Sequence, residues 1–491
     1  MIATLIRWSA RNLVLVMLGA AFLTAAGIYA VRQVPLDAIP DLSDTQVIVY
    51  SEYPGQAPQV VEDQVTFPLS TALLSVPKAK VVRGLSFFGV SFVYVIFEDG
   101  TDIYWARARV LEYLSAAQRQ LPQGVTATLG PDATGVGWVY QYAVMAAKRT
   151  LAELRSTQDW QVRFAVAEAE GVSEVASVGG FVRQYTVIVD PRRLKSFNIP
   201  LSKVSEAIRD SNMDVGGRVV EMAETEFMVR GRGYFRNVAD IEQIVLKAQD
   251  GAPVLVRDVA RVELMPDERR GLTELNGEGE VVSGIAVQRF GENALTVIDS
   301  VKDKLGEIAP SLPSGTEIVA VYDRSELINR AIATLKTTLA EESLIVALVC
   351  IVFLLHVRSA LVAIITLPLG VLIAYICMYA LGISSNIMSL GGIAIAIGAM
   401  VDAAIVMIEN AHKHLERAPP DKPRTEILIE AASEVGPALF FSLLIITVSF
   451  LPIFALEAQE GRLFKPLAFT KTFAMAAAAF LSVTLVPALM V

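Results

Sequence analysis

The stretch Gly398-Ala-Met-Val-Asp402-Ala-Ala-Ile-Val-Met-Ile-Glu409-Asn-Ala-His-Lys413 has the composition of a lipid-buried helix, with one carboxylate near its middle. A charged side chain at bilayer depth costs at least about 2.5–3.5 kcal/mol on insertion scales, and such residues are functional by default. A lone buried carboxylate becomes protonated, so Asp402 holds its charge only beside a cation or strong donor. We therefore interpret Asp402 as a candidate proton-relay residue. A structural contact with a neighbouring helix is the alternative.

Two other charged residues, Glu409 and Lys471, could take part in a proton relay with Asp402. Glu409 follows Asp402 by seven residues, about 700° of helical rotation, which places it within roughly 20° of the same face. It lies near the predicted cytoplasmic end of the span, where a water-facing glutamate needs no special role, and it is a weak candidate for the relay. Lys471, in the last apolar run, is a possible partner for Asp402, although an anchor at the membrane interface explains it equally well.

The composition favours a membrane protein. The 491 residues are 53% hydrophobic and 19% charged, whereas a soluble domain carries about 25% charged residues. The net charge of −9 gives no basic surface for a nucleic-acid partner. Six apolar runs have or approach the roughly 20 residues that cross a bilayer. These runs are Leu13–Val31, Leu344–Val357 with an upstream extension, Leu361–Leu381, Ile387–Ile408, Gly436–Leu456 and Pro466–Val491.

Basic residues predict the orientation of these spans, because cytoplasmic loops carry an excess of lysine and arginine. With a cytoplasmic N-terminus, the long segment between the first two spans lies outside the cytoplasm, and residues 411–434 form a cytoplasmic loop. The basic residues that then share the cytoplasmic side are Arg7, Arg11, Arg358, Lys413, Arg417, Lys422 and Arg424.

The long segment alternates between strand and helix periodicity. Its first part predicts strands 46–53, 80–86, 90–97 and 125–129, with helices 58–74 and 102–120. The order βαββαβ is that of the ferredoxin-like unit.

A second βαββαβ copy is predicted in two pieces. Leu121-Pro-Gln-Gly124 and Leu312-Pro-Ser-Gly315 end corresponding helices and favour duplication over one irregular α/β domain. Between the pieces, residues 184–266 form an inserted subdomain with a capped amphipathic helix at 199–208. The second copy has strands 139–145, 175–179, 280–290 and 317–321, and helices 151–170 and 293–308. The predicted domains are 1–33, 34–135, 136–183 with 267–325, 184–266, and 326–491.

Methionine is the candidate soft metal ligand, because thioethers favour Cu(I) and similar ions. Met388, Met400 and Met407 lie on the fourth span and Met475 on the sixth, although methionine in an apolar helix is usually packing. No glycine-rich phosphate loop follows a strand and no nucleophile–base pair stands out. The sequence therefore predicts no resident cofactor, no ATP-driven step and no enzyme.

The order of elements resembles the N-terminal half of resistance–nodulation–division (RND) transporters, and the local motifs resemble their copper/silver heavy-metal branch. The resemblance covers essentially the whole chain. Its motifs are Pro35-Leu-Asp-Ala-Ile-Pro-Asp-Leu-Ser-Asp44, Tyr53-Pro-Gly-Gln-Ala-Pro58, Phe97-Glu-Asp-Gly-Thr-Asp102, Gly130-Pro-Asp-Ala-Thr-Gly-Val-Gly-Trp138, Asn386-Ile-Met-Ser-Leu-Gly-Gly392 and the opening stretch.

The resemblance implies a bacterial inner-membrane metal/proton antiporter for Cu(I) or Ag(I). It assigns proton transfer to Asp402 and a metal path to Met388, Met400 and Met475. It also implies a homotrimer with a periplasmic adaptor and an outer-membrane channel, docked through the inserted subdomain. Two features depart from the family: Glu268 replaces a periplasmic methionine, and the homologous C-terminal half, with the main metal site and the partners of Asp402, is missing.

Two alternatives stay open. A divalent metal or an organic compound is the substrate in one. In the other, the chain is a truncated, non-transporting partner or regulator of a full-length pump. Because the second half is missing, the chain is expected to be either a fragment of a longer pump or a half-length variant that functions only after associating with another chain.

Overall fold

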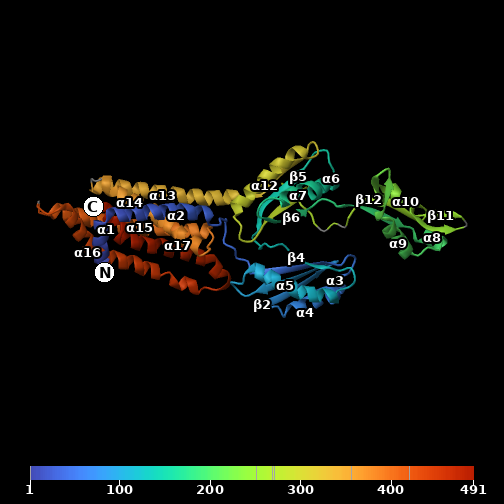
Figure 1. The fold of residues 1–491 in the computed structure, drawn as a ribbon, viewed down its shortest axis with the longest axis horizontal. Coiled ribbons are helices and arrows are strands. Elements are labelled where there is room, and N and C mark those ends of the chain that lie inside the picture. The colour runs from blue at the N-terminus through green and yellow to red at the C-terminus, as the bar shows by residue number, and fades with distance from the viewer. Residues whose placement is uncertain (1, 250, 268, 270, 355–356, 420) are drawn as a thin grey trace.

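The computed structural model describes residues 2–249, 251–267, 269, 271–354, 357–419 and 421–491. The molecule is elongated (Figure 1), with a helical bundle at one end, two sheet-containing units beside each other next to it, and a third small unit at the far end. The chain leaves the bundle after α2, forms the sheet units, and returns to the bundle at α13.

The bundle is built from the apolar runs. Its largest core contains buried residues of seven helices, among them Ile393 and Ile397 of α15 and Ala474 of α17. Two helix boundaries fall at residues that break the apolar pattern, since Asn12 separates α1 from α2 and Asn386 caps α15. The helices are α1 (Ile2–Arg11), α2 (Leu13–Gln33), α13 (Arg324–Leu354), α14 (Val357–Ala380), α15 (Ile387–Arg417), α16 (Arg424–Val448), α17 (Ala458–Val483) and α18 (Leu485–Met490).

Several of these helices fit a membrane. Among the described residues, four helical segments are long and apolar enough to cross one, and the apolar helix Ile364–Ala380 is shorter. The predicted span Leu344–Val357 includes residues 355–356, which lie outside the described part of the chain. The four long segments are Leu13–Gln33, Ile387–Arg417, Arg424–Ala455 and Ala458–Val483.

The end of the bundle differs from the prediction. The last span is predicted as Pro466–Val491, but α17 starts at Ala458, contains Pro466, and stops at Val483 before the separate helix α18. Glu460, Arg462 and Lys465 interrupt the apolar run without interrupting the helix, because charged side chains are good helix formers. Much of the predicted loop 411–434 is helical as well, since α15 continues to Arg417 and α16 begins at Arg424.

The first sheet unit follows α2. Its four predicted strands lie in one antiparallel sheet with the order β2-β3-β1-β4. Alternate residues such as Val47 and Val49 are buried against Leu69 and Val110 of the helices. Asp102 caps α5 by accepting from the Trp105 N–H at 2.7 Å. The elements are β1 (Gln46–Glu52), α3 (Pro58–Val61), a π-helical turn (Glu62–Thr66), α4 (Phe67–Leu73), β2 (Ala79–Phe87), β3 (Val90–Phe97), α5 (Ile103–Ala117) and β4 (Ala127–Leu129).

The second sheet unit is assembled from two distant parts of the chain. Its antiparallel sheet has the order β14-β5-β13-β6, and β13, which comes after the insertion, lies between β5 and β6. The predicted helix 151–170 contains a π-helical turn (Gln158–Val162) and ends at Ala167. The elements are β5 (Trp138–Met145), α6 (Leu151–Thr157), α7 (Arg163–Ala167), β6 (Val172–Val178), β13 (Val282–Gln288), α12 (Ala294–Ile308) and β14 (Glu317–Asp323).

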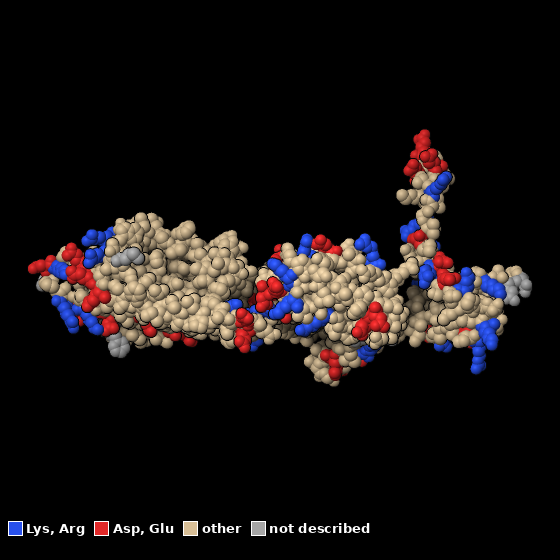
Figure 2. Space-filling model, turned by 90° about the horizontal axis from the view of Figure 1, so that it is seen from below, with Lys and Arg blue, Asp and Glu red and all other residues tan. Residues whose placement is uncertain are grey.

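The inserted unit hangs on a two-stranded stalk, β7 (Arg183–Val189) paired with β12 (Ala260–Pro266). The predicted helix 199–208 is α9 (Leu201–Ser211), and the residue before it is Pro200, so the expected side-chain cap is absent there. A hairpin of β8 (Val215–Met222) and β9 (Thr225–Gly231), here named the arm, projects from the unit (Figure 2). The other elements are α8 (Pro191–Ser196), α10 (Val238–Glu242), β10 (Val245–Gln249), β11 (Ala252–Leu255) and α11 (Val256–Val259).

Candidate functional site

Helix α15 carries most of the predicted site residues and has two different faces. The Asn386 side chain accepts from the Ser389 N–H at 3.0 Å, and the Ser389 hydroxyl accepts from the Asn386 N–H at 2.7 Å, which closes the helix start with a capping box. One face packs inside the bundle. The other is open along its length and includes the exposed residues Ile387, Ile395, Gly398, Asp402, Val406, Glu409 and Lys413.

Asp402 lies on this open face. Within the described residues its carboxylate forms no hydrogen bond and no ion pair, and the neighbouring exposed positions are apolar or glycine. Glu409 shares the face, as the seven-residue spacing predicts. Its carboxylate pairs with Lys413 at 2.6 Å within the same helix. Glu409 therefore has the partner expected of a residue at the water interface, and Asp402 does not.

Met400 and Met475 lie on the closed side of the bundle. Met400 is 5% exposed, Met475 is fully buried, and both belong to the same core. Helix α14 accommodates Met400 at Gly370, where a Cβ atom would lie 2.1 Å from the Met400 Cε. A small cavity next to Met400 is lined by Ala403 and Ala404 of α15 and by residues of α14, α17 and α18. Met388, in the first turn of α15, is only partly buried.

The beginning of α15 is in direct contact with the middle of α17. The Thr470 hydroxyl donates to the Ser389 carbonyl at 2.9 Å. A Cβ on Gly392 would lie 2.5 Å from the Leu467 carbonyl oxygen, so only glycine permits this approach. The two helices that bear Met400 and Met475 thus approach each other closely here, in addition to sharing the core of the bundle.

Two further methionines in the core receive no role from the sequence resemblance. Met378 on α14 and Met407 on α15 are fully buried in the same cluster as Met400 and Met475. Burial alone does not separate a ligand from a packing residue, because methionine fills irregular apolar gaps. Among the described residues there is no cluster of three or more His, Cys, Asp or Glu side chains able to hold a metal ion.

Lys471 is not a direct partner of Asp402. Its side chain is buried, at 8% exposure, and its Nζ lies 3.3 Å from the centre of the Phe450 ring. The ammonium group thus rests on an aromatic face, an arrangement that stabilises a cation. Within the described part of the chain it pairs with no carboxylate. The structure thus shows an aromatic contact for Lys471 in place of a pair with Asp402, and the role of an anchor at the membrane interface stays a prediction.

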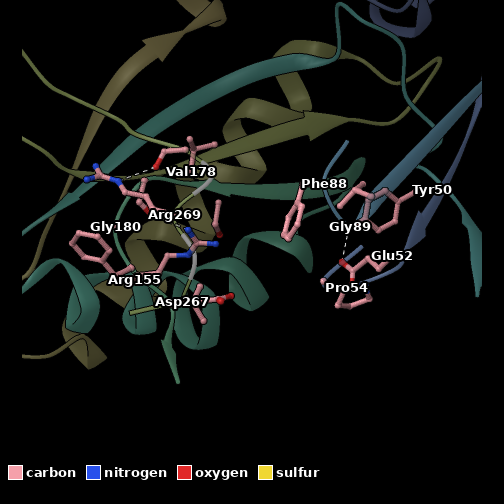
Figure 3. A pocket seen from close by; sticks show the side chains of 17 residues that line it. Tyr50, Glu52, Pro54, Phe88, Gly89, Arg155, Val178, Gly180, Asp267 and Arg269 are labelled. Carbon is pink, nitrogen blue, oxygen red and sulfur yellow. Dashed lines mark hydrogen bonds between the residues drawn. The ribbon is translucent and has the colours of Figure 1, made fainter. Parts of the chain in front are cut away.

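Outside the bundle, a cavity of about 740 Å³ lies between the two sheet units (Figure 3). The first unit contributes Glu52 and Phe88, and the second contributes Arg155, Asp267 and Arg269. Both arginines are already engaged: Arg155 pairs with Asp159 at 2.7 Å, and Arg269 pairs with Glu280 and lies 5.0 Å from the Phe181 ring centre. Glu268, predicted to replace a metal-path methionine, lies outside the described residues.

The family model described as AcrB/AcrD/AcrF family matches residues 5–491. The chain belongs to this family of RND transporters. It is 58% identical over 501 aligned residues to the cation efflux system protein CusA of Escherichia coli (strain K12), and 57% identical to the putative cation efflux system protein SilA of Salmonella typhimurium. Each alignment covers all of this chain and 48% of the relative. These similarities place the chain in the Cus/Sil branch.

More distant relatives agree with this assignment. The cobalt-zinc-cadmium resistance protein CzcA of Cupriavidus metallidurans is 36% identical over 96% of this chain and 46% of its own length. A crystal structure of a heavy metal efflux pump superimposes with a TM-score of 0.86 at 32% identity, covering 99% of this chain and 48% of that one. The chain therefore spans about half the length of the relatives it matches, and membership in a transporter family supports the expectation that it is not an enzyme.

Proposed function

We propose that this chain forms the N-terminal half of a proton-driven exporter of Cu(I) or Ag(I). The observation that carries the proposal is the division of α15, which places Met400 in the apolar core and Asp402 on the open face. A thioether in an apolar core suits a soft monovalent cation. A carboxylate at membrane depth, whose charge depends on what approaches it, suits proton coupling.

The membrane topology belongs to the same proposal. Figure 2 shows one face of the bundle as a broad, largely uncharged surface, with charged residues gathered at the end farthest from the sheet units and next to those units. Six spans (α2 and α13–α17) with a cytoplasmic N-terminus put both sheet units and the inserted unit in the periplasm. On the cytoplasmic side this topology gathers Arg7, Arg11, Lys413, Arg417, Lys422 and Arg424, which satisfies the excess of basic residues expected there.

We further propose that the two sheet units are a ferredoxin-like duplication. The strand orders β2-β3-β1-β4 and β14-β5-β13-β6 correspond position by position, since the first strand of each unit lies between the third and the fourth. The bounds that follow are 34–135 for the first unit, 136–183 with 267–325 for the second, and 184–266 for the inserted docking unit. Spans occupy 1–33 and 326–491.

The arm supports assembly with other copies of the chain. All of its strand residues are exposed, and Val219, Phe227 and Met228 are 47%, 50% and 87% exposed. An exposed two-stranded ribbon that carries apolar side chains is a surface expected to be covered by a partner. A homotrimer, in which each arm reaches a neighbouring copy, gives that cover.

The position of the inserted unit supports the two other proposed partners, an outer-membrane channel and a periplasmic adaptor. The inserted unit lies at the end of the molecule farthest from the bundle (Figure 1). In a periplasmic orientation it is the part that reaches towards an outer-membrane channel, with a periplasmic adaptor around the assembly. The rest of the pump, corresponding to the C-terminal half of the relatives, covers the open face of α15.

The test is transport by a full-length pump containing this chain, reconstituted in vesicles with an imposed proton gradient. Gradient-dependent Ag(I) movement is expected, and Asp402→Asn, which keeps the size of the side chain but cannot titrate, should abolish it. Normal transport by Asp402→Asn, or transport of Zn(II) in place of Ag(I), would contradict the proposal. Glu409→Gln is the matched control and should retain transport.

A further inference from the structure

The outer ends of α15 and α17 are attached to different sheet units. For α15, the attachment is a short backbone ladder to the segment that follows α2. The Asp37 N–H donates to the Ser385 carbonyl at 2.9 Å, the Ser385 N–H to the Pro35 carbonyl at 2.8 Å, and the Ile387 N–H to the Ala38 carbonyl at 3.0 Å. Three consecutive backbone bonds make this a stiff junction.

The same segment is fixed to the second sheet unit. Ala38 is 1% exposed in the core of that unit, and the Ala294 N–H at the start of α12 donates to the Leu36 carbonyl at 3.0 Å. Arg324, 5% exposed, binds Asp37 at 3.3 Å and the Trp138 carbonyl at 2.9 Å. The start of α15 and the second sheet unit therefore behave as one body.

The outer end of α17 is attached to the first sheet unit through one side chain. Arg462 donates to the Leu42 carbonyl at 3.0 Å and to Asp44 at 2.9 Å, and it also pairs with Asp99. Leu42 and Asp44 precede β1, and Asp99 follows β3. The planar guanidinium group holds three acceptors in a fixed geometry, which a flexible ammonium group does not.

The two sheet units also meet at the linker between β4 and β5, residues 130–137. The Arg107 guanidinium of the first unit donates to the Gly130 carbonyl at 2.8 Å. Asp132 of the linker pairs with Arg289 of the second unit at 2.9 Å and accepts a hydrogen bond from Ser173. The linker is thus held from both sides, and the cavity of about 740 Å³ lies between the units that it joins.

Resting on the proposed function, we propose that Arg462 is a positioning residue that transmits movement of α17 to the first sheet unit. Because α15 moves with the second unit, a shift of α17 against α15 becomes a rotation of one sheet unit against the other about the linker. The cavity between them then widens or narrows. In this way a protonation change on α15 alters the width of a cavity outside the bundle, although no cavity residue changes its own protonation state.

The experiment measures two distances by spin labelling in a cysteine-free, full-length pump. One pair, Phe88→Cys and Val182→Cys, spans the cavity, and the other, Ile395→Cys and Phe480→Cys, reports on α15 and α17. In the parent, acidification should shift both distances. In Arg462→Ala the membrane pair should still shift, the cavity pair should lose its shift, and its resting distribution should broaden. Arg462→Lys should restore part of the shift.

Lys465→Ala is the matched control, because Lys465 lies one turn further along α17 and forms no ion pair with any described residue. It should behave as the parent. A cavity pair in Arg462→Ala that is as narrow and as responsive as in the parent would overturn the proposal. So would a parent in which the membrane pair shifts and the cavity pair does not.

Failure of the proposed function gives a different result. Silver transport by the same preparation would then be independent of the proton gradient, and neither pair would respond to pH in the parent. The distance distribution of the cavity pair at neutral pH still tests Arg462 in that case. If Arg462 positions the first sheet unit, Arg462→Ala broadens this distribution. If it does not, the distribution is unchanged. A fall in maximal rate with unchanged half-saturation is expected for Arg462→Ala, because metal binding itself is not altered.

Discussion

Met400 and Asp402 are two positions apart on α15 and face opposite sides of the helix. Two residues correspond to about 200° of rotation, which leaves Met400 at 5% exposure between α14 and α17 and Asp402 on the open face. The two side chains therefore meet different surroundings although their backbones are neighbours. A metal next to Met400 and a proton on Asp402 would interact through the helix between them, without sharing a site.

Met400→Leu should lower silver transport without unfolding the bundle. The substitution conserves volume, so its cost to stability is expected to stay below about 1.5 kcal/mol, while the thioether is lost. Met378→Leu is the control, because Met378 is buried in the same core on α14. Equal transport by both variants, measured as Ag(I) uptake into vesicles, would indicate that Met400 only packs.

Gly392→Ala should destabilise the bundle by forcing α15 away from α17 where the two helices approach each other closely. A Cβ at this position would lie 2.3 Å from the Thr470 Oγ1 and 2.5 Å from the Leu467 carbonyl oxygen, and overpacking of this kind typically costs about 1–3 kcal/mol. Thermal unfolding in detergent measures the loss. Gly391→Ala is the matched control, since nothing lies within 4 Å of the position that its methyl group would occupy, and it should not be destabilised.

The difference between these two glycines illustrates what the sequence could not provide. Gly391 and Gly392 are adjacent in the same apolar run, and only the approach of Leu467 from α17 distinguishes them. The strands of the first sheet unit, by contrast, follow from local alternation, as in Val47 and Val49 of β1. The predicted last span begins at Pro466, whereas α17 begins at Ala458, because Glu460, Arg462 and Lys465 interrupt the apolar run without interrupting the helix.

The site shows the same division. The common face of Asp402 and Glu409 follows from helical spacing and agrees with their exposure. The contact of Lys471 with Phe450 joins α17 to the residues after α16, and no local pattern encodes it. The arm is not predictable either, because every residue of its two strands is exposed and the strands therefore carry no alternation of buried and exposed positions.

Replacing Val219, Phe227 and Met228 together by serine should weaken assembly of the full-length pump. These side chains are exposed on the arm, and removing their apolar area removes the expected contact with a neighbouring copy. Light scattering after size-exclusion chromatography should show smaller particles. Val245→Ser, at an exposed position of β10 in the same unit, is the control. A trimer that survives the triple change would mean that the arm has another partner or none.

Asp132 should make the stability of the linker between the sheet units depend on pH in the acidic range. Burial alone would raise the pKa of Asp132, but the Ser173 hydroxyl and the Arg289 guanidinium outweigh it, and the pKa is lowered below its usual value of 3.8. The charged form therefore contributes stability above the pKa of the unfolded chain, and this contribution disappears as the pH falls through the lower folded-state pKa.

Asp132→Asn should therefore lower the melting temperature at neutral pH, through loss of a charge-assisted contact worth about 1.5–3 kcal/mol. The difference from the parent should shrink in strongly acidic buffer. Asp303→Asn is the control, because Asp303 forms no ion pair among the described residues. If the difference in melting temperature between Asp132→Asn and the parent is the same at neutral and at strongly acidic pH, Asp132 does not contribute to the acid sensitivity.

Residues 1–491 expressed alone should enter the membrane and give no protection from silver. Asp402 needs a cation or donor to hold its charge, and in the described structure its face of α15 is open. Lys471, the buried cation of α17, rests on Phe450 and offers no charge to Asp402. The expected measurement is growth of a pump-deleted, silver-sensitive strain, with insertion checked by reporter fusions. Coexpression of the other half of a related pump should restore resistance. Protection by residues 1–491 alone, lost again in Asp402→Asn, would show that two copies of this chain complete the site for each other.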